Sequence, residues 1–124
     1  MNRTRRILVV EADPVIRGWM DRTLRSAGFR VSMAASLKEA ASRLSSRSGF
    51  HAVVSEYTMP DGTCPELLAA FRDERGRTLP ALVTSSETSA ATETTPDCHF
   101  LARPFDGAQL LSALDRLLGP NDLS

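Results

Sequence analysis

The residues that could do chemistry in this sequence stand directly after short apolar runs. They are two carboxylates, a hydroxyl and a guanidinium, namely Glu11, Glu56, Ser85 and Arg103. A further carboxylate, Asp13, follows the first of them closely. Carboxylates are ligands for hard cations such as Mg²⁺, and a guanidinium suits a carboxylate or a phosphoryl group. The set could therefore hold a metal ion and an anion, or its members could pair with one another, if the fold brings them together.

Apolar runs and amphipathic patterns alternate along the chain. The runs predict strands at 7–10, 30–34, 52–55, 81–84 and 100–102. Apolar residues at helical spacing predict helices in three of the connections and after the last strand, begun by Asp13, Ser36, Pro65 and Asp106. This alternation is typical of a parallel sheet covered by helices on both faces. In such sheets the chemistry lies at the carboxyl ends of the strands, where the polar residues above stand.

The connection at 86–98 breaks the helix pattern. It is rich in Thr and Ser and has no large apolar residue to bury. Because Thr and Ser are poor helix formers, we expect a short or degenerate fourth helix at about 88–94, or a mobile loop. A plain surface connection and a functional lid both fit this segment. The 124 residues suit one domain, which we expect over 1–120, with 121–124 as a tail or linker stub.

Composition excludes several classes of function. The 15 Lys and Arg residues balance the 15 Asp and Glu residues, which gives no electrostatic case for nucleic acid or an anionic membrane. The basic cluster of Arg3, Arg5 and Arg6 fits a frayed N-terminal arm equally well. Cys64 and Cys98 are too few for a disulfide framework or a metal site, so we expect reduced, structural thiols. No signal peptide or membrane span is visible, and we expect a cytoplasmic protein.

Four motifs follow one another in the order and spacing of a known domain. They are Ile-Leu-Val-Val-Glu-Ala-Asp-Pro at 7–14, Ser-Glu-Tyr-Thr-Met-Pro at 55–60, Leu-Pro-Ala-Leu-Val-Thr-Ser-Ser at 79–86 and Arg-Pro-Phe at 103–105. With them the sequence resembles the receiver domain of two-component response regulators along almost its whole length. The resemblance implies an α/β, flavodoxin-like, doubly wound fold with five parallel strands in the order 2-1-3-4-5. It also implies a cis peptide bond in the last motif.

The metal site of this family is altered here. Family members hold Mg²⁺ with two adjacent acids after the first strand, and these positions are Glu11 and Ala12 in this sequence. Asp13 is next in line, but we expect it to cap the following helix. With Glu56 and the position of Thr58, this leaves a degenerate Mg²⁺ site that is weak or absent. We therefore expect no cofactor, except Mg²⁺ if residual activity persists.

The phosphoacceptor and switch positions are altered as well. The acceptor Asp of the family is Glu56 and its Lys is Arg103, whereas its hydroxyl residue is Ser85, an accepted variant. The switch aromatic is Phe100, which has no hydroxyl. We interpret Glu56, Ser85 and Arg103 as a degenerate phosphoacceptor site with no intact catalytic residue. We interpret Ser85, Phe100, Arg103 and Pro104 as switch or interaction residues.

These substitutions favour an internal ion pair in place of a metal and a phosphoryl group. Glu56 carries one methylene more than Asp, which moves its carboxylate outward by roughly 1.5 Å. Arg103 offers a planar fork that suits a carboxylate. We predict a Glu56–Arg103 ion pair that mimics one signalling state. The alternative is that Glu11, Glu56 and Arg103 have drifted in a site that is no longer used.

The resemblance implies two-component signalling, and the residues leave three functions open. The first is a receiver that acts by binding a protein partner without phosphorylation, the partner being a histidine kinase, an output domain or a second copy. Its surface would be the face made by the fourth helix region, the fifth strand and the last helix. The second is a residual Mg²⁺-dependent phosphoacceptor on Glu56. The third is a small-anion site at the strand ends, with Ser85 and Arg103. We expect no enzyme activity beyond residual self-phosphorylation.

Overall fold

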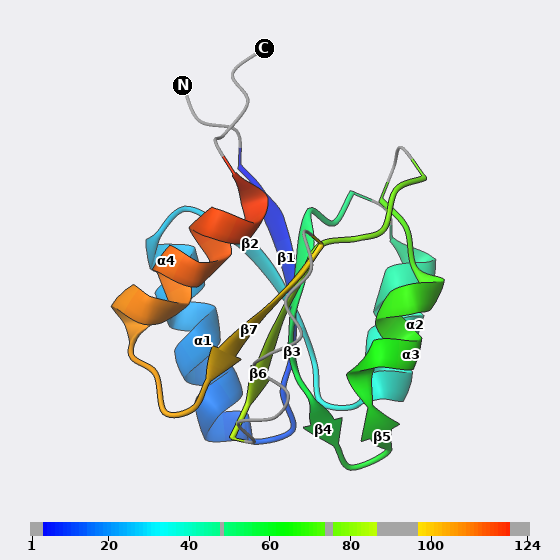
Figure 1. Cartoon of the computed structure of the whole chain (residues 1–124), viewed down its shortest axis with the longest axis horizontal. Helices are drawn as coiled ribbons and strands as arrows, with labels where there is room; N and C mark the ends of the chain where they lie inside the picture. The colour runs from blue at the N-terminus through cyan, green and yellow to red at the C-terminus, as the bar shows by residue number, and fades with distance from the viewer. Residues whose placement is uncertain (1–3, 48, 74–75, 87–96, 120–124) are drawn as a thin grey trace.

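A five-stranded parallel sheet forms the centre of the computed structural model (Figure 1). The residues described are 4–47, 49–73, 76–86 and 97–119. The strands, in their order across the sheet, are β2 (Arg30–Ala34), β1 (Arg6–Val10), β3 (Ala52–Glu56), β6 (Ala81–Ser85) and β7 (Cys98–Ala102). Neighbouring strands pair in parallel throughout. The predicted strand order is therefore confirmed.

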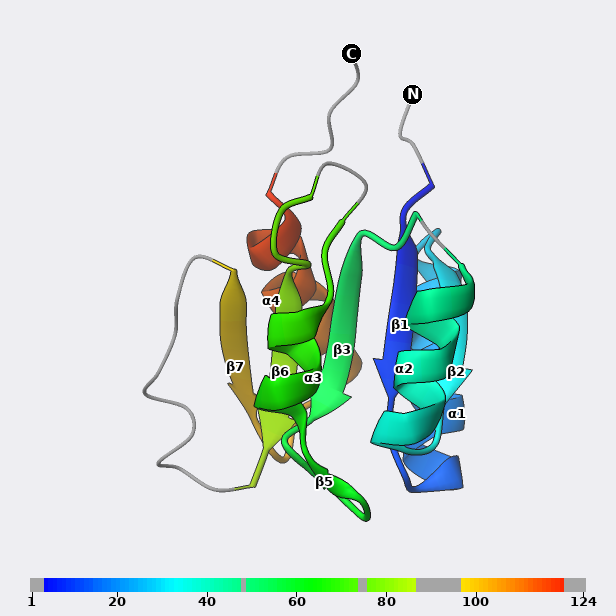
Figure 2. The ribbon, with the colours of Figure 1, turned by 90° about the vertical axis from the view of Figure 1, so that its right-hand side faces the viewer.

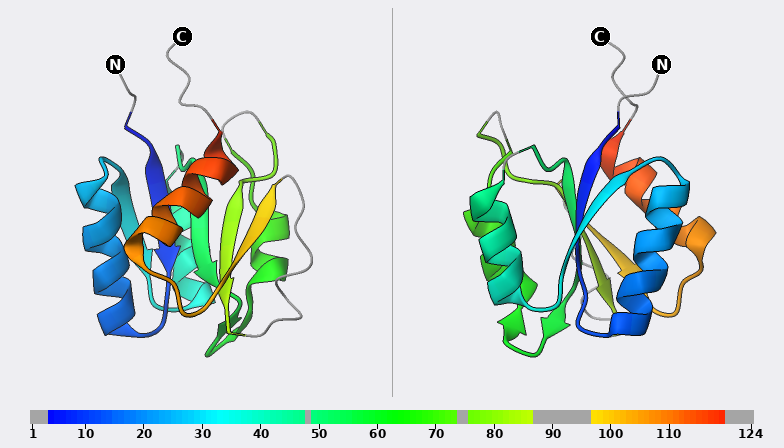
Figure 3. Two further views of the ribbon diagram at one scale, coloured as in Figure 1. Left: turned by 60° about the vertical axis from the view of Figure 1, so that its left-hand side comes forward. Right: turned by 180° about the vertical axis from the view of Figure 1, so that it is seen from behind.

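Helices cover both faces of this sheet. The helices α1 (Pro14–Ser26) and α4 (Gly107–Leu118) lie on one face, and α2 (Leu37–Ser46) and α3 (Cys64–Ala70) lie on the other (Figures 1 and 3). Because side chains alternate along a strand, β1 contributes to two cores. Ile7 and Val9 pack in the core under α1 and α4, whereas Leu8 and Val10 pack in the core under α2 and α3. This is the predicted doubly wound, flavodoxin-like α/β architecture.

The helices that flank the carboxyl edge begin at well-formed caps. The Asp13 carboxylate accepts the backbone N–H groups of Val15 and Ile16, and Pro14 occupies the first turn of α1. Asp106 and Gln109 form a reciprocal capping box at the start of α4. These caps satisfy backbone donors that a helix cannot pair internally. They fix the direction in which the chain leaves β1 and re-enters the α1–α4 layer.

The connection from β3 to α3 has secondary structure of its own. It contains a small antiparallel hairpin of β4 (Thr58–Met59) and β5 (Gly62–Thr63), which projects beyond the sheet (Figure 2). Pro60 and Asp61 form its turn, and Gly62 has a φ of 139°, a value that other residues adopt only with strain. The Asp61 carboxylate accepts the first N–H groups of α2, those of Leu37 and Lys38. The hairpin is thereby attached to the neighbouring helix.

The last strand and its exit differ slightly from expectation. Strand β7 begins at Cys98, two residues before the predicted start, because it pairs with β6 along that strand's whole length. The peptide bond between Arg103 and Pro104 is cis, as the resemblance implied. The predicted short helix at 88–94 and the tail at 121–124 lie outside the described residues. No helix within the described ranges is both long and apolar enough to span a membrane.

Candidate functional site

The polar residues singled out from the sequence meet at the carboxyl edge of the sheet. Glu11 follows β1, Glu56 ends β3, Ser85 ends β6 and Arg103 follows β7. These four strands are consecutive neighbours and run in the same direction. The register places Glu56 beside Thr84 and Ser85 beside Ala102. The fold therefore brings carboxylates, hydroxyls and a guanidinium into one cluster.

An ion pair between Arg103 and Glu11 lies at the centre of this cluster. Arg103 Nη2 donates to Glu11 Oε1 and also to Thr84 Oγ1, which is 3.2 Å away. The Glu11 side chain is only 2% exposed and the Arg103 side chain 19%. A buried carboxylate is costly unless a cation or several donors compensate it. Arg103 supplies that cation, and Asp13 N–H donates to the other Glu11 oxygen at 3.1 Å.

The predicted ion pair between Arg103 and Glu56 is present, but near the outer limit of distance, and the closer pairing of Arg103 with Glu11 was not predicted. Glu56 Oε2 lies 3.9 Å from Arg103 Nη2, near the outer limit for an ion pair, and the Glu56 side chain is 28% exposed. Glu11 takes the direct contact because its carboxylate is the more deeply buried of the two. The sequence pattern indicates Glu11 as a metal ligand, and the burial that requires a cation beside it is visible only in the folded structure.

Two further residues contribute to the cluster and were missed. Arg17 donates from Nη1 to the carbonyl oxygens of Glu11 (2.8 Å) and Ala12 (3.2 Å), so the first turn of α1 holds the acidic turn in place. Thr84 is fully buried and accepts from Arg103. The available signals were the position of Arg17 one turn into the helix and the place of Thr84 one residue before the strand end.

The comparisons with known proteins agree with this geometry. The profile of the response regulator receiver domain matches residues 7–115. The chain belongs to the response regulator receiver domain family. No curated protein matches it significantly. A receiver domain is a module of two-component signalling.

Solved receiver structures resemble the chain over nearly its whole length. The chemotaxis response regulator CheY4 of Vibrio cholerae is 29% identical, covers 94% of this chain and 100% of its own, and has a TM-score of 0.79. The receiver domain of the hybrid histidine kinase CckA is 30% identical, with 92% and 99% covered and a TM-score of 0.77. A response regulator of Thermotoga maritima in complex with Mg²⁺-BeF is 20% identical, with 93% and 100% covered and a TM-score of 0.77, and shows the fold alone.

The side chains of this receiver domain do not fit a Mg²⁺ ion. Glu11 has one oxygen on Arg103 and the other on a backbone N–H. The Asp13 carboxylate caps α1, and Ala12 has no carboxylate. Thr58 is exposed on the hairpin strand β4. Within the described ranges, no three His, Cys, Asp or Glu side chains are grouped as metal ligands.

The electrostatics of the receiver site disfavour a charge on Glu56. Burial raises the pKa of Glu56, and the neighbouring Glu11 carboxylate raises it further, with Asp13 adding a smaller effect. The Arg103 guanidinium opposes this but does not cancel it. A single guanidinium faces two carboxylates, and its direct contact is with Glu11. Glu56 therefore takes up a proton more readily than a free glutamate does.

The predicted switch residues of the receiver domain lie on β6 and β7 or directly after β7. Ser85 is buried, and Phe100 is half-buried against the core under α2 and α3. The Arg103 guanidinium carbon lies 6.0 Å from the centre of the Phe105 ring, which follows the cis Pro104. Arg103 Nε is buried without a hydrogen-bond partner among the described residues. Contacts on several sides hold the guanidinium at the sheet edge.

Proposed function

We propose that this receiver domain signals by binding a protein partner without being phosphorylated. The observation that carries the proposal is the position of the Arg103 guanidinium, bound to Glu11 and Thr84 and 3.9 Å from Glu56. A cation at this place offsets carboxylate charge, as Mg²⁺ does in an active receiver. The buried Glu11 charge is thus compensated from within the chain, at the point where a donor phosphate would have to enter.

The altered acceptor supports the same proposal. Phosphoryl transfer depends on positioning and on neutralising charge. The extra methylene of Glu56 displaces its carboxylate by roughly 1.5 Å, and a misplacement of about 1 Å can cost on the order of 10²-fold in rate. Ala12 removes a metal ligand at the same time. Together these changes leave an acceptor that is out of place and lacks a metal to assist it.

The partner surface we propose is formed by β7 and α4. Receiver domains in general interact with histidine kinases and output domains, so a protein is the partner class to expect. Arg103, which directly follows β7, connects this surface to the carboxyl edge. A receiver fixed in one state would present the surface constantly, and the amount of protein rather than phosphorylation would then set the signal.

Intact-mass measurement after incubation with acetyl phosphate and Mg²⁺ tests the proposal. We expect no phosphoryl adduct on the native chain. The matched control is a variant with Ala12→Asp, Glu56→Asp and Arg103→Lys, which restores the family's residues and should gain one phosphoryl group under the same conditions.

A residual phosphoacceptor is the second candidate function. It is favoured by the 28% exposure of the Glu56 side chain, which leaves the carboxylate accessible. A native adduct that disappears in Glu56→Gln would establish this function and refute the first proposal.

A further inference from the structure

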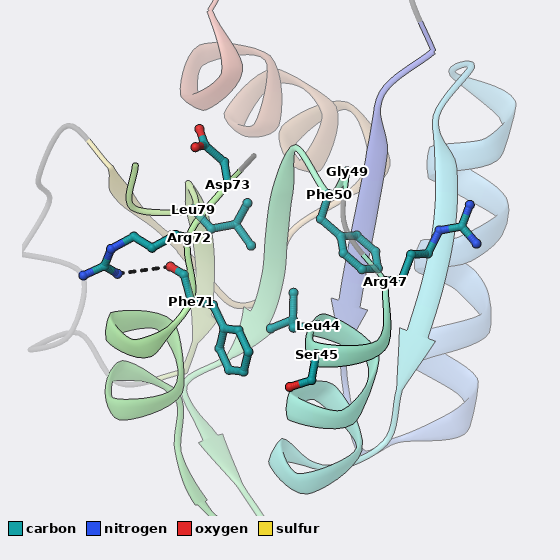
Figure 4. A pocket seen from close by; sticks show the side chains of 9 residues that line it. All are labelled: Leu44, Ser45, Arg47, Gly49, Phe50, Phe71, Arg72, Asp73 and Leu79. Atoms are coloured by element: carbon teal, nitrogen blue, oxygen red, sulfur yellow. Dashed lines mark hydrogen bonds between the residues drawn. The ribbon is translucent and has the colours of Figure 1, made fainter. Parts of the chain in front are cut away.

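A cleft between α2 and α3 lies at the amino end of the sheet, opposite the Arg103 cluster at the carboxyl edge. Its floor is apolar, because Leu44, Phe50, Phe71 and Leu79 turn toward one another there (Figure 4). The cleft has a volume of about 150 Å³. An apolar space of this size accommodates a benzene-sized group. The cleft is therefore large enough for one aromatic or branched aliphatic side chain.

Arginine side chains from three elements lie close enough for their charges to interact, and one of them, Arg47, lines this cleft. Arg47 ends α2 and lines the cleft directly. Arg6 and Arg30 begin β1 and β2 and are register partners. By strand alternation both point to the face of α2 and α3, since Leu8 and Ala34 at alternate positions pack in that core. One edge of the cleft is consequently basic.

The charge on this edge is not compensated by the described part of the chain. None of the ion pairs among the described residues includes Arg6, Arg30 or Arg47. Burial lowers the pKa of Arg6, and the charges of Arg47 and Arg30 lower it further, as like charges held close together must. The acidic lining residue Asp73 pairs with Arg77 at 3.0 Å. An anion arriving at the cleft edge would relieve this repulsion.

We propose that the cleft binds an acidic protein segment that inserts one aromatic or aliphatic side chain between α2 and α3. The apolar floor supplies the anchor pocket, and the three arginines supply complementary charge. Nucleic acid fits less well, because its bases bind single-stranded sites by stacking on exposed aromatic faces. Phe50 is 6% exposed and forms part of the floor, so it offers no such face.

Nuclear magnetic resonance titration of the ¹⁵N-labelled chain tests this proposal, because it detects weak as well as tight binding. The probe is a synthetic peptide of alternating Glu and Ser with one central Phe. We expect saturable shifts at the amides of Arg30, Arg47, Phe50 and Phe71 that weaken with added salt. The peptide with Ser in place of Phe should bind at least tenfold more weakly, since it lacks the anchor.

Charge-reversed variants supply the matched comparison. Arg47→Glu should weaken peptide binding about fivefold or more, the upper range for an exposed charge pair. Arg116→Glu makes the same change on α4, on the opposite face of the sheet, and should leave binding unchanged. Both sites are exposed, so neither variant should affect folding.

Four outcomes would overturn the proposal. They are an absence of cleft shifts at millimolar peptide, equal binding of the peptide without Phe, equal effects of the two charge reversals, and equal or tighter binding of a single-stranded oligonucleotide of the same charge.

Discussion

Replacing Arg103 by Met removes the cation that faces the buried Glu11 carboxylate while keeping most of the side-chain volume. Removing one partner of a buried ion pair costs about 3–5 kcal/mol, because the other charge is left uncompensated. The Asp13 N–H remains as a donor to Glu11, which favours the lower end of that range. Protonating a glutamate at pH 7 costs about 3.5 kcal/mol. The loss of stability cannot exceed this cost, because a protonated side chain has no charge to bury. We expect a loss of about 3 kcal/mol.

Urea unfolding at pH 7 measures this loss, and thermal unfolding should show a decrease in Tm of about 10 °C. The double variant Arg103→Met with Glu11→Gln should recover most of the stability, since the buried Glu11 charge is removed as well. The exposed Arg116→Met is the control, with an expected change below about 0.5 kcal/mol. A loss below about 1 kcal/mol for Arg103→Met, or a double variant less stable than the single one, would refute the reasoning.

Three further predictions follow from the pKa shifts. Glu56→Gln should be more stable than the native chain at pH 7, because the raised pKa of Glu56 means that its charge is unfavourable in the folded state. Urea unfolding should show this difference vanishing as the pH falls below 4.5. A destabilised variant at pH 7 would contradict this. Asp61→Ala should lower the Tm at neutral pH, because the N–H groups of Leu37 and Lys38 stabilise the Asp61 carboxylate and lower its pKa. The difference in Tm should be lost as the pH falls below 3.8. Equal melting of the two proteins at pH 7 would count against this contact. Burial raises the pKa of the Cys64 thiol to about 11, so iodoacetamide at pH 8 should leave Cys64 unmodified until urea is added, whereas rapid native labelling would show an accessible thiol.

The sequence allowed the fold to be predicted because periodicity and motif placement led to the same result. Apolar runs of five residues or fewer, separated by capped helices, indicate a covered parallel sheet, and the Arg-Pro-Phe motif implied the cis bond before Pro104. The edge of the sheet at which Glu11, Glu56 and Arg103 meet follows from strand direction alone. Which of them touch does not, because that depends on side-chain reach and burial.

The hairpin and the partner of Arg103 show where prediction from sequence stops. Pro60-Asp61-Gly62 is a recognisable turn signal, but two-residue strands are too short to leave a periodic pattern. The preference of Arg103 for Glu11 rests on a difference in burial between two carboxylates, which becomes visible only when the strands are packed. Both features lie at the candidate site, where local pattern constrains the chain least.

The most direct test of the account is a titration of the ¹⁵N-labelled native chain with Mg²⁺ and then beryllofluoride, which imitates a bound phosphoryl group without requiring transfer chemistry. The readout is the set of amide signals of Glu11, Glu56, Ser85 and Arg103. We expect no saturable shift in the native chain, and clear shifts in the variant with Ala12→Asp, Glu56→Asp and Arg103→Lys. Saturable shifts at these amides in the native chain, abolished by Glu56→Gln, would contradict the claim that the Arg103 ion pair has replaced the metal and the phosphoryl group.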